Sequence, residues 1–282
     1  SMRDMLEAGA HFGHQTSRRN PKMTPFIYGA KNGVHIINLQ RTARQLRDAL
    51  HYVSRLGQKG EQILFVGTKR QAQDVIFQEA SRSGQPYVTH RWLGGMLTNF
   101  RTINQSLDRM KNIEKQLEVG NVERLTKKEV IRLERALAKL TRTCGGLRDM
   151  DKLPAAVFIV DTVKEHIALA EARKLGLKVV AVADTNANPD LIDYPIPAND
   201  DAIRSIRLFA SAIADAYLEG AALHKDSMMR EYGSGSKGSA ESAGVDVIVR
   251  KAEPEEAPAA EATEVAEAAP EAEAAPVEAP AE

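Results

Sequence analysis

The amino-acid sequence predicts an α/β fold in which a mostly parallel sheet is sandwiched between helices. Two observations lead to this prediction. Short apolar runs rich in β-branched residues alternate with segments of helical periodicity over most of the chain. Several of the helical segments also begin at a capping residue shortly after a strand. This order of elements is typical of the Rossmann- or flavodoxin-like class, and 282 residues are enough to bury its core.

The strands of the predicted sheet are short, continuous apolar segments bounded by polar residues, as expected for strands that are covered on both faces. Ile63–Val66, Ala156–Val160 and Val179–Ala183 show this pattern most clearly. Val34–Ile37 and Tyr87–Val88 are shorter candidates.

Three helices are predicted from a capping residue at the start and a glycine at the end. The first runs from Asn38 to Gly57. The second begins at Asp161 or Thr162 and ends at Gly176, and the third runs from residue 199 to residue 220. Together with the strands, they give an open α/β sandwich.

Residues 101–146 interrupt this alternation, because they contain no strand pattern and instead resemble two charged helices. Thr126 and Glu129 have the spacing of a capping box for the second helix. An inserted antiparallel coiled-coil hairpin is the expected result, although two ordinary surface helices remain an alternative, since two heptads per helix is short. The apolar residues at heptad-compatible spacing are Ile103, Leu107, Met110, Leu117, Val130, Leu133, Leu137 and Leu140.

The insertion makes the predicted α/β domain discontinuous, with residues 1–100 and 147–230 on either side of the hairpin. Residues 231–282 form a linker followed by an Ala/Glu/Pro-rich segment whose prolines predict a disordered acidic tail. The tail holds 13 acidic and 3 basic residues, a net charge of −10. The remaining 35 basic and 25 acidic residues give the body +10, which suits a polyanionic partner.

The chain shows no sign of an extracellular or membrane protein. Its single cysteine, Cys144, cannot form an intramolecular disulfide and is expected to be a packing residue. A signal-peptide pattern and an apolar run of membrane-spanning length are both missing from the sequence. We therefore expect a cytoplasmic protein with no membrane partner.

The glycine motifs of the sequence do not predict an enzyme. Gly67-Thr-Lys69 follows a buried strand and opens a helix, where doubly wound folds bind phosphate. The further glycines of a dinucleotide or P-loop fingerprint are missing, so no nucleotide cofactor is expected, and Lys69 is left on an exposed turn where it can meet an RNA phosphate. Gly94–Gly95 either cradles a phosphate or lets two backbone segments pass closely.

A histidine and three acids form the one constellation with metal-ligand chemistry. They are His14, Asp184 after a predicted strand, and Asp200 and Asp201 before the last helix. Strand ends and helix starts meet at one edge of such a sheet, and an imidazole with carboxylates can hold zinc or a harder cation such as magnesium. The alternative is that these acids only complete turns and helix starts.

Several long peptides occur in an order and spacing that resemble bacterial small-subunit ribosomal protein two. The resemblance covers residues 1 to about 220. The matching peptides are His11-Phe-Gly-His-Gln-Thr16, Asn20-Pro-Lys-Met23, Phe65-Val-Gly-Thr-Lys-Arg70, His90-Arg-Trp-Leu-Gly-Gly-Met-Leu-Thr-Asn99, Leu125-Thr-Lys-Lys-Glu129, Gly145-Gly-Leu-Arg-Asp-Met150 and Asn199-Asp-Asp-Ala-Ile-Arg204.

The resemblance implies a structural constituent of the small ribosomal subunit, bound to ribosomes in the cytoplasm and taking part in translation without catalysing a reaction. Such a protein binds small-subunit ribosomal RNA between head and body, contacts neighbouring proteins and helps to dock ribosomal protein one, which captures messenger RNA. No cofactor is required. A Zn or Mg ion at the docking surface would use His14, Asp184, Asp200 and Asp201.

The chain departs from this family at Ser17-Arg18-Arg19, where the family usually has an aromatic pair. Cationic contact is therefore expected there in place of stacking. About six phosphate contacts predict that log affinity falls with log salt at a slope near −4 to −5. The residues expected to face RNA are Arg18, Arg19, Lys22, Lys31, Lys69, Arg70, Arg91, Trp92 and Arg101. For Trp92, which would stack on a base, a place in the core is the alternative.

Two other classes of function remain open from the residues alone. A nucleotide-using enzyme would bind a cofactor through Lys69. A coiled-coil adaptor without RNA would depend on the apolar faces of the hairpin, including Leu107 and Leu137.

Overall fold

A computed structural model describes residues 1–117 and 126–235, with side chains up to residue 229. The described residues belong to one compact unit. The predicted disordered tail and the turn between the hairpin helices lie outside the described residues. The helix that precedes the tail continues to Gly235, past the predicted domain end at residue 230.

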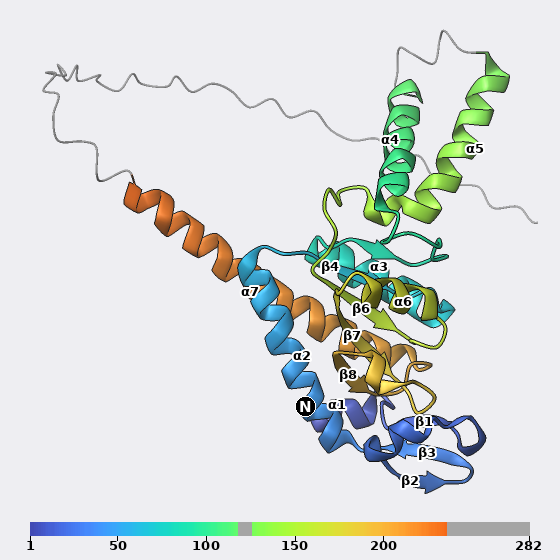
Figure 1. The fold of residues 1–282 in the computed structure, drawn as a ribbon, viewed down its shortest axis with the longest axis vertical. Coiled ribbons are helices and arrows are strands. Elements are labelled where there is room, and N and C mark those ends of the chain that lie inside the picture. Colours follow the sequence, from blue (N-terminus) through green and yellow to red (C-terminus); the bar gives the residue numbers. More distant parts are fainter. Residues whose placement is uncertain (118–125, 236–282) are drawn as a thin grey trace, which may run out of the picture. The chain divides into compact units, whose positions relative to one another are not determined.

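The main sheet has five strands, all parallel to their neighbours. They are β4 (Ile63–Val66), β5 (Tyr87–Val88), β6 (Ala156–Val160), β7 (Lys178–Ala183) and β8 (Tyr194–Pro197). Their spatial order is β5-β4-β6-β7-β8, so the first strand in the chain lies between the second and the third. This is the flavodoxin-like order, in which the direction of strand addition along the sheet reverses between β4 and β6. The predicted fold class is confirmed (Figure 1).

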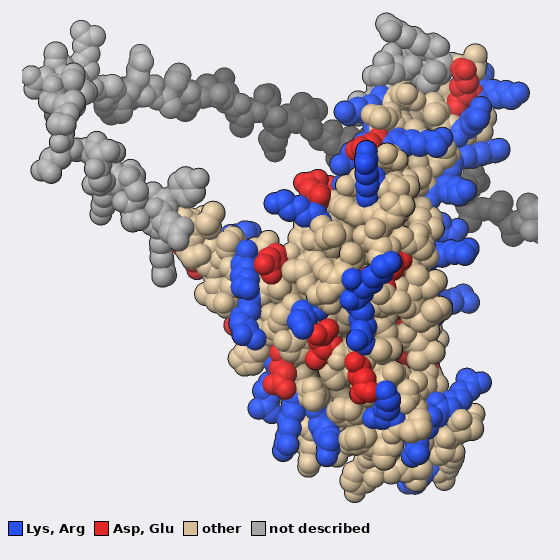
Figure 2. Space-filling view, in the orientation of Figure 1, with Lys and Arg blue, Asp and Glu red and all other residues tan. Residues whose placement is uncertain are grey.

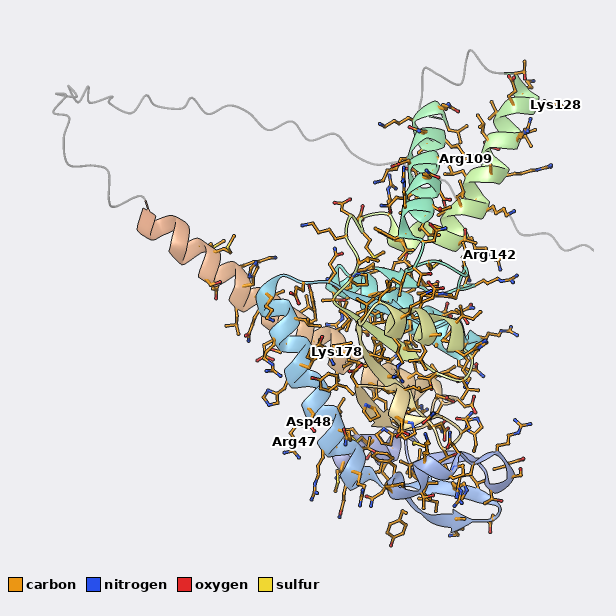
Figure 3. All side chains as sticks on the ribbon, viewed as in Figure 1. Arg47, Asp48, Arg109, Lys128, Arg142 and Lys178 are labelled. Carbon is orange, nitrogen blue, oxygen red and sulfur yellow. The ribbon has the colours of Figure 1, made fainter. Side chains whose placement is uncertain are left out.

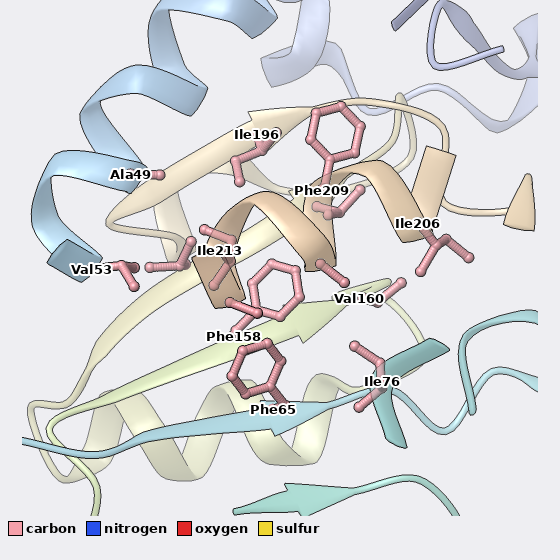
Figure 4. Close-up of a cluster of buried hydrophobic side chains, with 14 of the residues drawn as sticks. Ala49, Val53, Phe65, Ile76, Phe158, Val160, Ile196, Ile206, Phe209 and Ile213 are labelled. Carbon is pink, nitrogen blue, oxygen red and sulfur yellow. The ribbon is translucent and has the colours of Figure 1, made fainter. Parts of the chain in front are cut away.

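One face of the sheet is covered by α2 (Leu39–Lys59), α3 (Arg70–Ser83) and α7 (Ile203–Gly235). Phe65 and Phe158 point to this face from adjacent strands, with their ring centroids 5.4 Å apart, edge to face. Phe209 and Ile213 of α7 lie in the same buried cluster (Figure 4). Aromatic pairs of this kind add to the apolar burial that holds helices on a sheet.

Two glycines allow α2 and α7 to cross with their backbones in contact. A Cβ on Gly57 would lie 2.4 Å from the Tyr217 carbonyl oxygen, and one on Gly220 would lie 2.0 Å from the Ser54 carbonyl oxygen. The prediction that both glycines end their helices is therefore wrong. α2 continues to a left-handed cap at Gly60, and α7 runs on through residue 235. Glycines placed for close approach have the same sequence signal as C-caps.

The other face is covered by α6 (His166–Lys174), the bases of α4 (Phe100–Leu117) and α5 (Lys127–Cys144), and the 3₁₀ turn η4 (Gly145–Leu147). Cys144 is buried in this cluster, as expected of a packing residue. α6 begins later than predicted because Asp161 has a positive φ of 66° and caps a turn, accepting hydrogen bonds from the backbone N–H of Val163 and Lys164.

A buried glutamate of α6 organises the loop between β5 and α4. The Glu171 carboxylate accepts hydrogen bonds from the Trp92 indole and from the backbone N–H groups of Gly95 and Leu97. The backbone and the hydroxyl of Thr98 add two more. The backbone around Gly94–Gly95 therefore binds an anion, as the phosphate-binding alternative in the sequence analysis expected. The anion is the Glu171 carboxylate of the protein itself.

The two hairpin helices rise from the domain side by side at their base (Figure 1). Ile103, Leu107 and Met110 are buried, as the heptad spacing predicts, and so is Ile113, which that spacing missed. The capping box of Thr126 and Glu129 is confirmed. The apolar residues of α5 predicted at heptad spacing, Val130, Leu133, Leu137 and Leu140, are half-buried, and supercoiling of the pair remains a prediction.

A smaller antiparallel sheet near the N-terminus consists of β1 (Phe12–Gln15), β2 (Ile27–Lys31) and β3 (Val34–Ile37). α1 (Met2–Glu7) and the 3₁₀ turns η1 (Thr16–Arg18) and η2 (Pro21–Phe26) complete this region, and η5 (Pro189–Leu191) lies between β7 and β8. The sequence missed β1, β2 and β8. β8 contains two prolines, which a strand tolerates at the edge of a sheet.

No helix among the described residues has both the length and the apolar character needed to cross a membrane.

Candidate functional site

The carboxyl ends of the parallel strands bring several charged residues together. Lys69 lies in the turn after β4, Asp161 directly follows β6, and Asp184 directly follows β7. Asp200 and Asp201 lie between β8 and α7. Because parallel strands all end at the same edge, residues separated by more than 130 positions meet there, next to the point where the strand order reverses.

Lys69 is at the centre of this acidic cluster. Its Nζ lies 2.7 Å from Asp200 Oδ1, 2.6 Å from Asp201 Oδ1 and 3.3 Å from Asp161 Oδ2. The Lys69 side chain is only 12% exposed, and that of Asp200 is 1% exposed. The ammonium group thus fills the crevice in which doubly wound enzymes place a phosphate or a cofactor.

His14 brings the small N-terminal sheet to the same cluster. Its Nδ1 lies 2.8 Å from Asp184 Oδ2, and its Nε2 lies 3.8 Å from Asp201 Oδ2. Its backbone N–H donates to the Thr185 hydroxyl. A Cβ on Gly13 would lie 2.7 Å from Thr185 Cγ2, so only glycine lets β1 approach this closely. This contact explains the glycine of the His-Phe-Gly-His motif.

The electrostatics of the cluster reflect an excess of buried negative charge. Burial, together with Asp161 and Asp184, raises the pKa of Asp200 to about 7, and Lys69 offsets only part of this. Burial lowers the pKa of Lys69, but the hydrogen bonds to Asp200 and Asp201 outweigh it and hold the pKa above its usual range. The contact with Asp184 raises the pKa of His14. A further cation would relieve this excess.

The donor atoms fit a metal ion. One ligand atom each from His14, Asp184 and Asp200 lies within 4.8 Å of the other two. Asp201, the fourth predicted ligand, is not part of this compact group and instead pairs with Lys69. One imidazole with carboxylates is a donor set that zinc accepts, whereas magnesium prefers oxygen ligands alone. Lys69 occupies one Asp200 oxygen, which leaves the other oxygen for an ion.

Two residues predicted to face RNA lie elsewhere. The ammonium of Lys69 forms the internal ion pairs described above and does not lie on an exposed turn. Trp92 is 6% exposed and donates to Glu171, so its ring packs in the core and offers no face for base stacking. Neither Lys69 nor Trp92 is therefore expected to contact RNA.

The other predicted RNA-facing cations are exposed and fall into three places. Arg18, Arg19, Lys22 and Lys31 lie in or beside the N-terminal sheet; Lys22 pairs with Asp190, and both partners are exposed. Arg70 opens α3, and Arg91 and Arg101 lie near the base of the hairpin. On the face shown in Figure 2, Lys and Arg side chains extend over both the hairpin and the N-terminal region.

Sequence reasoning missed Asp161 and Gly13. Asp161 follows a strand just as Asp184 does, and this position was the available signal. It was instead interpreted as a helix cap, a role that it also performs in part. The contact of Gly13 with Thr185 has no signal in the sequence, because the two residues are far apart in the chain.

The fold and the site together define a flavodoxin-like α/β protein with a basic surface. At the sheet edge where such folds bind ligands, its own side chains occupy the crevice. Comparison with known proteins identifies the family. Residues 5–220 match the family model described as ribosomal protein S2, so the chain belongs to the ribosomal protein S2 family.

Curated relatives named small ribosomal subunit protein uS2 agree with this result. The protein of Nitratidesulfovibrio vulgaris strain DP4 is 57% identical over 226 residues, covering 80% of this chain and 89% of its own. That of Solidesulfovibrio magneticus is 55% identical over 226 residues, covering 80% and 88%. That of Sorangium cellulosum is 56% identical over 225 residues, covering 80% and 81%.

Proposed function

We propose that this chain is a structural constituent of the small ribosomal subunit in the cytoplasm, and that it positions RNA and protein partners without catalysing a reaction. Family membership supports the ribosomal role. The observation that carries the structural role is the filled crevice, in which the Lys69 ammonium lies within 3.3 Å of three carboxylates. A phosphate brought to this edge would meet those carboxylates, so a nucleotide cofactor is not expected.

The exposed cations of the N-terminal region are the proposed contact with small-subunit ribosomal RNA. Arg18, Arg19 and Lys31 form no ion pair with any described residue, so their charge is available to phosphates. Lys22 is paired with Asp190, but an exposed pair of this kind is worth about 0–1 kcal/mol and yields to a phosphate. Contacts with phosphates position a protein on RNA and release counterions.

Co-sedimentation tests this proposal directly. The full chain is mixed with small subunits depleted of the corresponding protein, and bound protein is measured at increasing salt. A variant with Arg18, Arg19 and Lys31 changed to Glu should lose binding. A control with Arg47, Arg55 and Lys59 of α2 changed to Glu carries the same change of charge at equally exposed positions and should keep it. Equal loss in both variants, or a flat response to salt, contradicts the proposal.

We also propose that the cluster at the sheet edge takes a zinc ion and helps to dock ribosomal protein one. His14, Asp184 and Asp200 would hold the ion, which would clamp the N-terminal sheet to the main sheet and balance the buried carboxylates. Asp201 supports docking, because its side chain is 55% exposed beside the buried ligands and can reach a partner.

The ion and the partner are tested separately. Zinc binding is measured by calorimetry on the full chain, and Asp184→Asn should abolish it while Asp190→Asn, an exposed neighbour, leaves it intact. Docking is measured as retention of purified ribosomal protein one by small subunits carrying the Asp201→Asn chain. Retention equal to that of the unchanged chain would remove Asp201 from the docking surface.

A further inference from the structure

The outer face of α5 carries a straight row of cations that no sequence motif predicted. They occur at helical spacing, in the order Lys128, Arg132, Arg135, Lys139 and Arg142. At 100° and 1.5 Å per residue, they span an arc of about 80° and a length of about 21 Å. We call this row the α5 stripe. Lys128 and Arg142 mark its two ends (Figure 3).

The stripe lies opposite the apolar face of α5. Leu133, Leu137 and Leu140 lie on the other side of the helix by the same spacing and are half-buried, and Leu137 and Leu140 pack against the buried cluster at the base of the hairpin. All five stripe residues are exposed. None of them forms an ion pair with any other residue that the structure describes. The hairpin therefore presents a row of unpaired cations to solvent along α5, and one of them, Arg132, also lines a hollow between α4 and α5.

At its lower end, the stripe borders two adjoining hollows in the surface. One has a volume of about 520 Å³ and lies between α5, β5 and α3. The other, of about 560 Å³, is lined by Arg91 and Lys139. Both hollows share His90 and Arg142. Each volume lies within the range of small-molecule sites in proteins.

The first hollow has an aromatic wall. Phe77 of α3 lines this hollow, and its side chain is 50% exposed. Its ring packs edge to face on Tyr87, with centroids 5.3 Å apart, so the pair is held in place while the Phe77 ring remains accessible. Cations that lead to an accessible aromatic ring are the arrangement that binds single-stranded nucleic acid.

We propose that the α5 stripe and the Phe77 hollow bind a single RNA strand, with phosphates along the stripe and one unpaired base stacked on Phe77. This inference rests on the RNA-binding role proposed above and assigns it a second surface, distinct from the N-terminal cations. Charge favours RNA over a protein partner, because Glu134 is the single acid that lines either hollow, against Arg91, Lys139 and Arg142. An acidic peptide is the competing occupant.

The test uses the full chain and a fluorescein-labelled oligouridine of about 12 nucleotides, measured by fluorescence anisotropy. A duplex of the same length and an oligoglutamate peptide are the comparison probes. The key variants are Phe77→Leu, which keeps apolar volume but has no ring, and the pair Lys139→Gln with Arg142→Gln. The matched control is Arg55→Gln with Lys59→Gln on α2, which removes two equally exposed cations.

Phe77→Leu should weaken oligouridine binding about 5- to 150-fold, the loss expected for one stacked base. The Lys139/Arg142 pair should reduce the slope of log affinity against log salt by about 1.4, and the α2 pair should leave it unchanged. Phe77→Trp should restore binding, which shows that a ring is required and that the fold is intact.

The inference is overturned if Phe77→Leu binds oligouridine as well as the unchanged chain, or if the α2 control loses as much binding as the Lys139/Arg142 pair. It is also overturned if the unchanged chain binds the duplex or oligoglutamate more tightly than oligouridine. Subunit co-sedimentation separates this failure from failure of the proposed function. If co-sedimentation still depends on Arg18 and Arg19, the ribosomal role stands without the α5 site. If the unchanged chain does not sediment with small subunits, the proposed function itself fails.

Discussion

The Glu171 carboxylate accepts five hydrogen bonds from residues 92–98, and the change Glu171→Gln tests whether it holds this loop in place. Glutamine has nearly the same shape but only one acceptor oxygen. Oε2 accepts three of the bonds, from Leu97 and Thr98. The glutamine oxygen should take that place, so its NH₂ group will face the donors of Trp92 and Gly95.

Two buried donors then lose their acceptor, and each orphaned donor costs about 1–3 kcal/mol. Neutralising a buried carboxylate removes a desolvation penalty and offsets part of this cost. We expect a net loss of about 3 kcal/mol in the free energy of unfolding, which corresponds to about 6–12 °C in Tm for a domain of this size.

The assay is urea unfolding at pH 7, followed by the fluorescence of Trp92, the only tryptophan. Glu219→Gln on the exposed side of α7 is the control and should change stability by less than about 0.5 kcal/mol. If Glu171→Gln is as stable as the unchanged chain, the carboxylate does not hold the loop, and the hydrogen-bond argument is refuted.

The pH dependence gives the same prediction a second readout. Burial raises the pKa of Glu171, but the hydrogen bonds from Thr98, Trp92, Gly95 and Leu97 outweigh it and hold the pKa below its usual range. A carboxylate whose pKa is lower in the folded than in the unfolded state stabilises the fold at pH values above its unfolded-state pKa. This stabilisation is lost as the pH falls through the folded-state pKa. The stability difference between the unchanged chain and Glu171→Gln should therefore be constant near neutral pH and shrink as the pH falls below the usual glutamate pKa of about 4.3.

Three further outcomes follow from the packing and the charges. Gly57→Ala should cost about 3 kcal/mol by urea unfolding, because its Cβ meets backbone, whereas Gly94→Ala, with open space around it, should cost less than about 1 kcal/mol. Lys69→Met should destabilise by about 3–5 kcal/mol by leaving buried carboxylates unpaired, and adding Asp200→Asn should recover part of that loss in a double-mutant cycle. Cys144 should react with a thiol reagent only at the rate of unfolding, and rapid labelling of the folded chain would contradict its burial.

The strands of the main sheet were largely predictable because apolar continuity is a local signal. Ile63–Val66 and Ala156–Val160 have the predicted bounds. Helix ends were less predictable, because Gly57 and Gly220 have the composition of caps while their role is set by a neighbouring helix. β8 was missed because its prolines argue against a strand unless its position at the sheet edge is known.

The acidic cluster was predictable in part for a topological reason. Once a parallel sheet is assumed, residues that follow its strands must meet, and His14, Asp184 and Asp200 do. What the sequence could not predict is that Lys69 turns inward to those acids, since a lysine after a glycine turn is usually exposed. Trp92 was similarly ambiguous, and the glutamate that accepts its N–H lies 79 residues away.

The hydrogen bonds that join the N-terminal region to the main sheet have a consequence for biosynthesis. His14 and Gly9 leave the ribosome first, but their partners Thr185 and Asn199 follow 171 and 190 residues later. At about 5–20 residues per second, this delay lasts about 10–40 s. During that time, β1 to β3 and their arginines have no sheet edge to dock on, so the N-terminal region docks only after the strands of the main sheet have been made. Its docking therefore reports that synthesis has passed β8, while α7 is still to follow.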